Sequence, residues 1–196
     1  MTLNIDELLA ELPTLETERL LLRKITPTDE ADVFAYASDP EVPKYMPWEP
    51  HQSLEDTRVY LASVFERYRQ HTPGPWGIVH KGDAKLIGTC AYHDWQRNDR
   101  RAEIGYVLSR SYWGQGYMAE AVHALVAFGF REMGLNRIQA TCDVPNTSSA
   151  RVMEKVGMRF EGVLREYFFE KGSHIDLKLY SILRSEWRDH VIALVK

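Results

Sequence analysis

Cysteine is scarce in this chain, and long apolar runs are missing. The 196 residues include two cysteines, Cys90 and Cys142, both in strand-like segments. Their spacing suits no zinc site and favours a reducing compartment. No apolar run approaches the roughly 18 residues that a membrane-spanning helix needs. The stretch 1–12 is amphipathic and acidic, unlike a signal peptide. We therefore expect a cytoplasmic protein that is not membrane-bound.

A strong excess of positive charge is also missing. The chain has 24 Lys and Arg against 28 Asp and Glu, a net charge of −4, which argues against a nucleic-acid partner. With 44% apolar and 27% charged residues, the composition is typical of a globular protein. The length fits one domain with a sizeable core. Nothing in the composition decides between a monomer and a homodimer.

The common nucleotide-binding fingerprints are incomplete around the glycine pair Gly114 and Gly116. The dinucleotide pattern G-x-G-x-x-G fails because residue 119 is alanine, and no Gly-Lys-Ser/Thr follows. The pair nevertheless lies between a strand-like segment, 102–108, and a helix-like apolar repeat that starts at Met118. Glycines there allow a tight turn, and the unpaired N–H groups of the helix start suit a phosphate. The alternative is an ordinary loop.

The pattern along the chain predicts one mixed α/β domain. A proline-rich loop over 39–50 separates its first two helices. Strands are expected at 18–24, 75–80, 86–93, 101–108, 137–142, 159–170 and 174–183. Helices are expected at 27–37, 54–70, 118–133 and 146–155, and the stretch 185–195 allows a last one.

A second motif runs from Asn146 to Met158, with the sequence Asn-Thr-Ser-Ser-Ala-Arg-Val-Met-Glu-Lys-Val-Gly-Met. Together with the glycine turn and the Glu-Ile-Gly-Tyr strand at 103–106, it resembles the GNAT superfamily of acetyl-CoA-dependent N-acetyltransferases. The resemblance runs from about Leu15 to about Trp187. It is most similar to the RimJ/RimL branch, which acetylates the N-termini of ribosomal proteins. The resemblance implies a single domain over 1–196, with a mixed, mostly antiparallel sheet of about seven strands flanked by helices.

The resemblance also implies where acetyl-CoA binds. The expected contacts are backbone groups of the glycine turn and of the preceding strand, together with side chains of the second motif: Val107, Leu108, Ser109, Gly114, Gln115, Gly116, Tyr117, Met118, Ala119, Asn146, Arg151 and Lys155. The family's turn usually begins with Gln or Arg, whereas this chain has Ser111, so Arg110 is a substitute source of charge. Arg151 and Lys155 share a helix face, and a solvated charged face is their alternative.

Acetyl transfer needs a base for the ammonium acceptor and a proton for the departing thiolate. Glu103 matches a position that serves as base in several branches of the family; its alternative is a solvated strand position. Ser149 matches a serine near the coenzyme sulfur, and a helix-capping role is its alternative. Tyr45 and Trp48 belong to a stiff loop that borders the acceptor opening in the resembled branch, although they are equally suited to cover the core edge.

Three functional readings follow. The first is acetyl transfer to the N-terminal amine of a protein. The second is transfer to a small molecule such as a polyamine, an aminoglycoside or an amino-acid derivative. The third is a coenzyme-A-binding sensor without catalysis, which the presence of both Glu103 and Ser149 disfavours. His51, His93 and His174 are scattered without carboxylates at ligand spacing, so no metal is expected.

Overall fold

A computed structural model describes residues 12–72 and 74–188, which contain one eight-stranded sheet. The strand order is β1-β2-β3-β4-β5-β6-β8-β7. Neighbouring strands are antiparallel except for β5 and β6, which are parallel. The expected mixed, mostly antiparallel α/β sheet is confirmed. The strands are β1 (Leu15–Glu16), β2 (Leu20–Lys24), β3 (Trp76–His80), β4 (Lys85–Gln96), β5 (Arg101–Leu108), β6 (Arg137–Asp143), β7 (Arg159–Glu170) and β8 (Ser173–Leu183).

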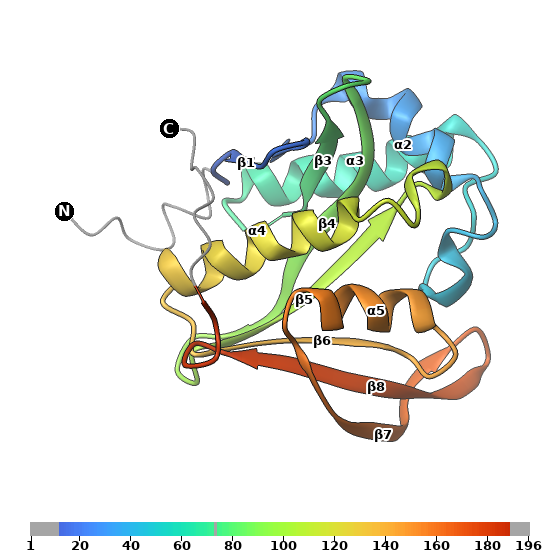
Figure 1. Cartoon of the computed structure of the whole chain (residues 1–196). Helices are drawn as coiled ribbons and strands as arrows, with labels where there is room; N and C mark the ends of the chain where they lie inside the picture. The colour runs from blue at the N-terminus through green and yellow to red at the C-terminus, as the bar shows by residue number, and fades with distance from the viewer. Residues whose placement is uncertain (1–11, 73, 189–196) are drawn as a thin grey trace.

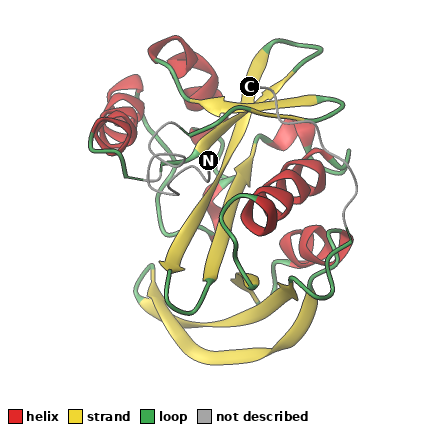
Figure 2. Ribbon diagram, turned by 90° about the vertical axis from the view of Figure 1, so that its left-hand side faces the viewer, coloured by secondary structure: helices red, strands yellow, loops and turns green. Residues whose placement is uncertain are grey.

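Helices cover both faces of the sheet (Figure 2). On one face, α2 (Glu30–Ala37) and α3 (Leu54–Arg69) bury Val33, Leu61 and Val64 against strand residues such as Leu86. On the other face, α4 (Tyr117–Arg131) and α5 (Thr147–Lys155) pack over the larger core cluster. Successive side chains of a strand point to opposite faces. One set of alternate residues in β4 and β5 therefore faces α2 and α3, and the other set faces α4 and α5.

The two halves of the sheet separate between β5 and β6. These strands pair only at their starts, and the last pair in the ladder is Glu103 with Gln139. Beyond it the strands diverge, as Figure 1 shows. The remainder of β5, from Ile104 to Leu108, therefore has a strand partner on its β4 side alone. An open strand edge of this kind offers unpaired N–H and C=O groups to a ligand.

Several expectations about individual elements need correction or extension. The strand β1 was not expected. The helix expected at 27–37 begins as a 3₁₀ turn, η1 (Pro27–Asp29), before α2. The last helix allowed at 185–195 is absent over 185–188, where the chain forms a turn. Residues 189–196 and the acidic stretch 1–11 lie outside the described residues. The predicted cap of α3 is present, since the Ser53 N–H donates to Asp56 Oδ2 at 2.9 Å.

Candidate active site

The glycine turn lies at the start of α4, as expected. Gly114 and Gly116 have φ of +75° and +84°, in the left-handed region that favours glycine. Among the described residues, no side chain caps this helix, so the first N–H groups of α4 have no partner within it. A Cβ built on Gly116 would meet only Arg19 Nη2, at 3.6 Å. The turn is thus an open cradle of amides suited to a pyrophosphate.

The hydrogen-bond register of β5 decides which of its main-chain groups face the open edge. The Ser109 N–H donates to the Ile87 carbonyl at 2.7 Å. Because bonded positions alternate in an antiparallel pair, the groups of Val107 turn toward β4, and those of Tyr106 and Leu108 turn toward the opening. The Leu108 carbonyl accepts the Trp113 Nε1–H at 2.8 Å. This register favours Tyr106 and Leu108 as strand-like partners of a pantetheine arm; the contact expected through Val107 stays a prediction.

A cavity of about 1220 Å³ joins the glycine turn to the opposite face of the sheet. It is lined by ten of the twelve residues expected to bind the coenzyme, and also by Glu103, Ser149, Tyr45 and Trp48. The remaining two, Ser109 and Gln115, do not line it, and their roles stay predictions. Arg110, the proposed substitute charge, forms an ion pair with Asp39 through Nε and Oδ2 at 2.6 Å.

Ser149 lies near the start of α5, where Asn146 caps the helix. The Ser149 N–H donates to Asn146 Oδ1 at 3.1 Å, so the expected capping role of Asn146 is confirmed. The Ser149 hydroxyl is 2.8 Å from the Tyr106 hydroxyl, which is also 3.2 Å from the Ser149 carbonyl oxygen. Burial raises the pKa of Tyr106, so its hydroxyl stays protonated. Tyr106 ends the Glu-Ile-Gly-Tyr motif, and no role for it was predicted from the sequence.

Glu103 lies where β5 and β6 part, on the face opposite to Tyr106. Its Oε1 accepts a hydrogen bond from Thr141 Oγ1 at 2.7 Å, and its Oε2 accepts one from Gln139 Nε2 at 3.1 Å. These bonds hold the carboxylate at the wall of the cavity. The arrangement places a proton acceptor on the α2–α3 side of the sheet and a pair of hydroxyl donors on the α4–α5 side.

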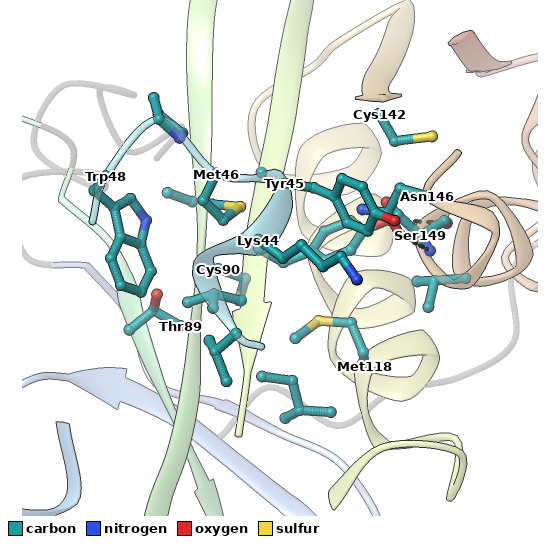
Figure 3. A pocket seen from close by; sticks show the side chains of 18 of the residues that line it. Lys44, Tyr45, Met46, Trp48, Thr89, Cys90, Met118, Cys142, Asn146 and Ser149 are labelled. Carbon is teal, nitrogen blue, oxygen red and sulfur yellow. Dashed lines mark hydrogen bonds between the residues drawn. The ribbon is translucent and has the colours of Figure 1, made fainter. Parts of the chain in front are cut away.

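The α2–α3 side of the cavity is lined by the proline-rich loop and the β7–β8 hairpin. In Figure 3, Trp48 and Tyr45 project from the loop into the pocket, and the Tyr45 ring extends toward the α5 side where Asn146 and Ser149 lie. Lys171, at the hairpin turn, donates from Nζ to the Pro43 carbonyl at 2.9 Å. Tyr167 and Phe168 of β7 line the same space. The half of the cavity on the α2–α3 side is therefore rich in aromatic side chains.

A further polar side chain in this half, His93, was not singled out by the sequence as a site residue. It lies on β4 directly opposite Glu103 and lines the cavity. Desolvation lowers the pKa of His93, and the positive charge of Arg67 lowers it further. The signal available in the sequence was the period-two spacing of Thr89, Ala91 and His93, which places them on one face.

The described residues contain neither a metal-binding cluster nor a membrane-spanning helix. Within 12–72 and 74–188, no group of three or more His, Cys, Asp or Glu side chains is placed to hold a metal ion. In the same part of the chain, no helix is long and apolar enough to cross a membrane.

Comparison with known proteins gives consistent matches. A family model described as the acetyltransferase (GNAT) domain matches residues 19–159. The uncharacterized N-acetyltransferase YoaA of Bacillus subtilis (strain 168) is 37% identical over 172 residues, covering 88% of this chain and 97% of the relative. The ribosomal-protein-serine acetyltransferase of Escherichia coli (strain K12) is 32% identical over 131 residues, covering 66% and 72% respectively.

A solved structure has the same fold. The crystal structure of an acetyltransferase (GNAT family) from Bacillus anthracis superimposes with a TM-score of 0.79 at 35% identity. The match covers 88% of this chain and 99% of that one.

Proposed function

Because this chain belongs to the GNAT family and is an acetyl-CoA-dependent N-acetyltransferase, we propose that its acceptor is the N-terminal amine of a protein or peptide. The observation that carries the proposal is the chemistry of the half of the cavity on the α2–α3 side, where we place the acceptor. Three segments line it: the proline-rich loop with Tyr45 and Trp48, α3, and the β7–β8 hairpin with Tyr167 and Phe168. A cavity with aromatic walls suits an extended peptide.

In this proposal, the residues divide the chemistry between the two faces of the sheet. The coenzyme supplies an activated acetyl thioester, held by the amides of the glycine turn and the open edge of β5. Arg151 and Lys155 of α5 line the cavity and add positive charge for its phosphates. Glu103 attracts the acceptor ammonium and accepts its proton, directly or through a water. Ser149, backed by Tyr106, provides a proton for the thiolate.

The acceptor is tested by thiol release from acetyl-CoA with a panel of amines. We expect a peptide with a free, small N-terminal residue to have a higher kcat/KM than spermidine or an aminoglycoside. The matched control is the same peptide with its N-terminus already acetylated, which should release no thiol above background. A higher kcat/KM for spermidine or an aminoglycoside overturns the peptide proposal and leaves the acetyltransferase activity in place.

The second candidate, a small cationic amine, is favoured by a separate observation. Asp143 and Glu170 line the same cavity as Glu103. Burial raises the pKa of both carboxyl groups, and for Glu170 the nearby charges of Asp143 and Glu49 raise it further. Carboxylates crowded in this way gain from a polycation that neutralises them. If spermidine is the acceptor, the pair of changes Asp143→Asn and Glu170→Gln should raise its KM and leave the KM for acetyl-CoA unchanged.

We also propose that the chain belongs to the RimJ/RimL-like branch and is located in the cytoplasm. The similarity to a ribosomal-protein-serine acetyltransferase supports the branch, and thus a ribosomal protein as natural acceptor. Cys90 and Cys142 are free and buried, which is compatible with a reducing compartment.

A further inference from the structure

We propose that His93, paired with Glu103 across β4 and β5, is the group that accepts the proton of the acceptor amine. Glu103 then acts on His93 as well as on the ammonium: its negative charge favours the imidazolium that forms. The proposal refines the base assigned to Glu103 and applies to either acceptor class, because both are primary amines.

The position of the His93 ring follows from the strand register and from Gly105. His93 and Glu103 are directly opposite in the antiparallel ladder, which brings their Cβ atoms to roughly 4.5–5.5 Å apart. The ring lies over Gly105: a Cβ built on that glycine would be 2.6 Å from Nε2 and 2.9 Å from Cδ2 of His93. The absence of a side chain at Gly105 therefore makes room for the imidazole beside the gap between β5 and β6.

Glu103 is held in place by hydrogen bonds. Both of its carboxylate oxygens already accept hydrogen bonds, from Thr141 and Gln139. A carboxylate held in this way is well placed to orient and to stabilise a positive charge. None of the hydrogen bonds among the described residues engages the His93 ring, which is exposed to the cavity. The imidazole is thus a proton acceptor without a hydrogen-bond partner among the described residues, and it is open to a substrate.

The surroundings of His93 favour its neutral, unprotonated form. Burial and the Arg67 guanidinium of α3 lower its pKa, whereas the Glu103 carboxylate of β5 raises it. The net shift is downward from 6.5, so the imidazole is neutral and ready to accept a proton near neutral pH. Arg67 lines the same cavity, and its charge discourages a permanent imidazolium.

The proton balance is as follows. The ammonium transfers one proton to His93, which later releases it to solvent. The freed amine lone pair forms the C–N bond to the acetyl carbon, and the C–S bond breaks with its electron pair on sulfur. The thiolate takes a proton from the Ser149–Tyr106 hydroxyl pair, directly or through water. The second proton leaves the nitrogen as the amide forms and restores the proton of that pair. The products are the amide, coenzyme A with a free thiol, and one proton in solution.

The test is His93→Gln, assayed with whichever amine of the panel is turned over fastest. We expect kcat/KM for the amine to fall by roughly 10²-fold, with the KM for acetyl-CoA unchanged. In the unmodified enzyme, kcat/KM should rise as the pH rises through the His93 pKa, below 6.5. The variant should lose that rise. If it keeps both its kcat/KM and the rise, the proposal is wrong.

Two further variants separate a chemical role from a structural one. Gly105→Ala keeps the imidazole but forces the ring away from its place, so it should also lower kcat/KM by tenfold or more. The control His174→Gln removes an exposed histidine of β8 that does not line the cavity, and it should have no effect. Full activity of Gly105→Ala in a folded protein with a displaced ring would count against the proposal.

A readout without turnover is the NMR titration of the His93 imidazole in the free enzyme. Replacing Glu103 by Gln removes the charge that favours the imidazolium, so the titration midpoint should move to lower pH. An unchanged midpoint would show that the two residues are not coupled and would overturn the pair. Failure of the peptide as acceptor affects the proposed function alone, because this titration needs no acceptor.

Discussion

The hydroxyl oxygens of Tyr106 and Ser149 lie 2.8 Å apart, although 43 residues separate them in the chain. Tyr106 belongs to the face of β5 that α4 and α5 cover, whereas Glu103 faces α2 and α3. One strand therefore carries, on opposite faces, the carboxylate of the proposed Glu103–His93 pair and the hydroxyl that supports the proposed proton donor Ser149. The gap between β5 and β6 connects these faces, so in the proposed mechanism groups on both faces can act on the same bound substrates.

The first prediction concerns this pair of hydroxyls. Ser149→Ala should lower turnover more for acetyl-CoA than for an activated thioester whose thiol has a low pKa, because a better leaving group needs less help from an acid. Tyr106→Phe should lower turnover in the same direction, by about tenfold. Since the two act as a unit, the double variant should be little worse than Ser149→Ala. Steady-state kinetics with both donors measures this.

If Ser149→Ala lowers turnover equally with the two donors, Ser149 serves as a helix-capping residue at the start of α5 and not as a proton donor. The matched control is Ser148→Ala, the neighbouring serine that also lines the cavity, which should leave the donor dependence unchanged.

The second prediction tests the glycine cradle. Gly116→Val should weaken acetyl-CoA binding by tenfold or more, about 1.4 kcal/mol, because the side chain blocks the approach to the amides. Gly134→Val is the control: Gly134 also has a positive φ, +62°, with nothing within 4 Å of its Cβ. That variant should lose stability through similar strain but keep its affinity. Calorimetry on folded protein decides, and unchanged affinity in Gly116→Val contradicts the assignment.

The third prediction concerns the Glu103 carboxylate. Glu103→Gln keeps the shape but removes the charge, so turnover should fall by roughly 10²–10⁴-fold with coenzyme affinity nearly intact. Thr141→Val removes one hydrogen bond to the carboxylate and should produce a smaller loss. Kinetics across pH 6 to 9 check this; a Glu103→Gln enzyme that retains its rate over this range would show that the carboxylate is dispensable.

Most helices and strands follow from local sequence patterns and are predicted well. The glycine turn, the Asn146 cap and the Ser53–Asp56 cap each involve residues within a few positions of one another, so local chemistry decides them. β1 was missed because two residues are too few to show a period of two. The extension of β4 to Gln96 was missed because the ladder is irregular between His93 and Gln96, where Asp94 has φ of +41°.

The pairs that make the site depend on long-range register, which a single sequence does not contain. Glu103 was identified through the family resemblance, but its bonds to Thr141 and Gln139 depend on how β5 and β6 align before they part. Tyr106 meets Ser149 only because α5 packs on the Tyr106 face. His93 looked isolated because its partner follows ten residues later, on the far side of a turn.

The fourth prediction concerns the contribution of Asp29 to stability. Asp29 is 5% exposed and accepts two hydrogen bonds from Arg23, at 2.7 and 2.8 Å. Burial raises its pKa, but the bonds from Arg23 and Thr26 outweigh this, so the pKa is lowered from 3.8. Asp29→Asn should reduce the free energy of unfolding by about 3 kcal/mol at neutral pH.

The sign of the pH dependence follows from the lowered pKa. The stability that the Asp29 charge contributes is present above 3.8 and is lost as the pH falls toward the lower pKa of the folded state. Denaturant unfolding of both proteins should therefore show a difference that shrinks on acidification. A difference that does not change with pH would indicate that packing, and not the charge, makes Asp29 important.

The last prediction concerns Trp48 and the acceptor. Trp48 is half-buried: it packs against the core beneath α2 and α3, and its ring also lines the cavity, so both roles expected from the sequence are compatible with its position. Trp48→Ala should raise the KM for a peptide acceptor and leave the KM for acetyl-CoA unchanged, because the coenzyme contacts lie on the other side of β5. Trp48→Phe keeps an aromatic ring at this position, so its KM for the peptide should lie between those of the unmodified enzyme and of Trp48→Ala. Phe160→Ala is the control, since Phe160 is 52% exposed on β7 and does not line the cavity. If Trp48→Ala raises both KM values equally, its effect is a general loss of packing, and the loop is not the acceptor wall.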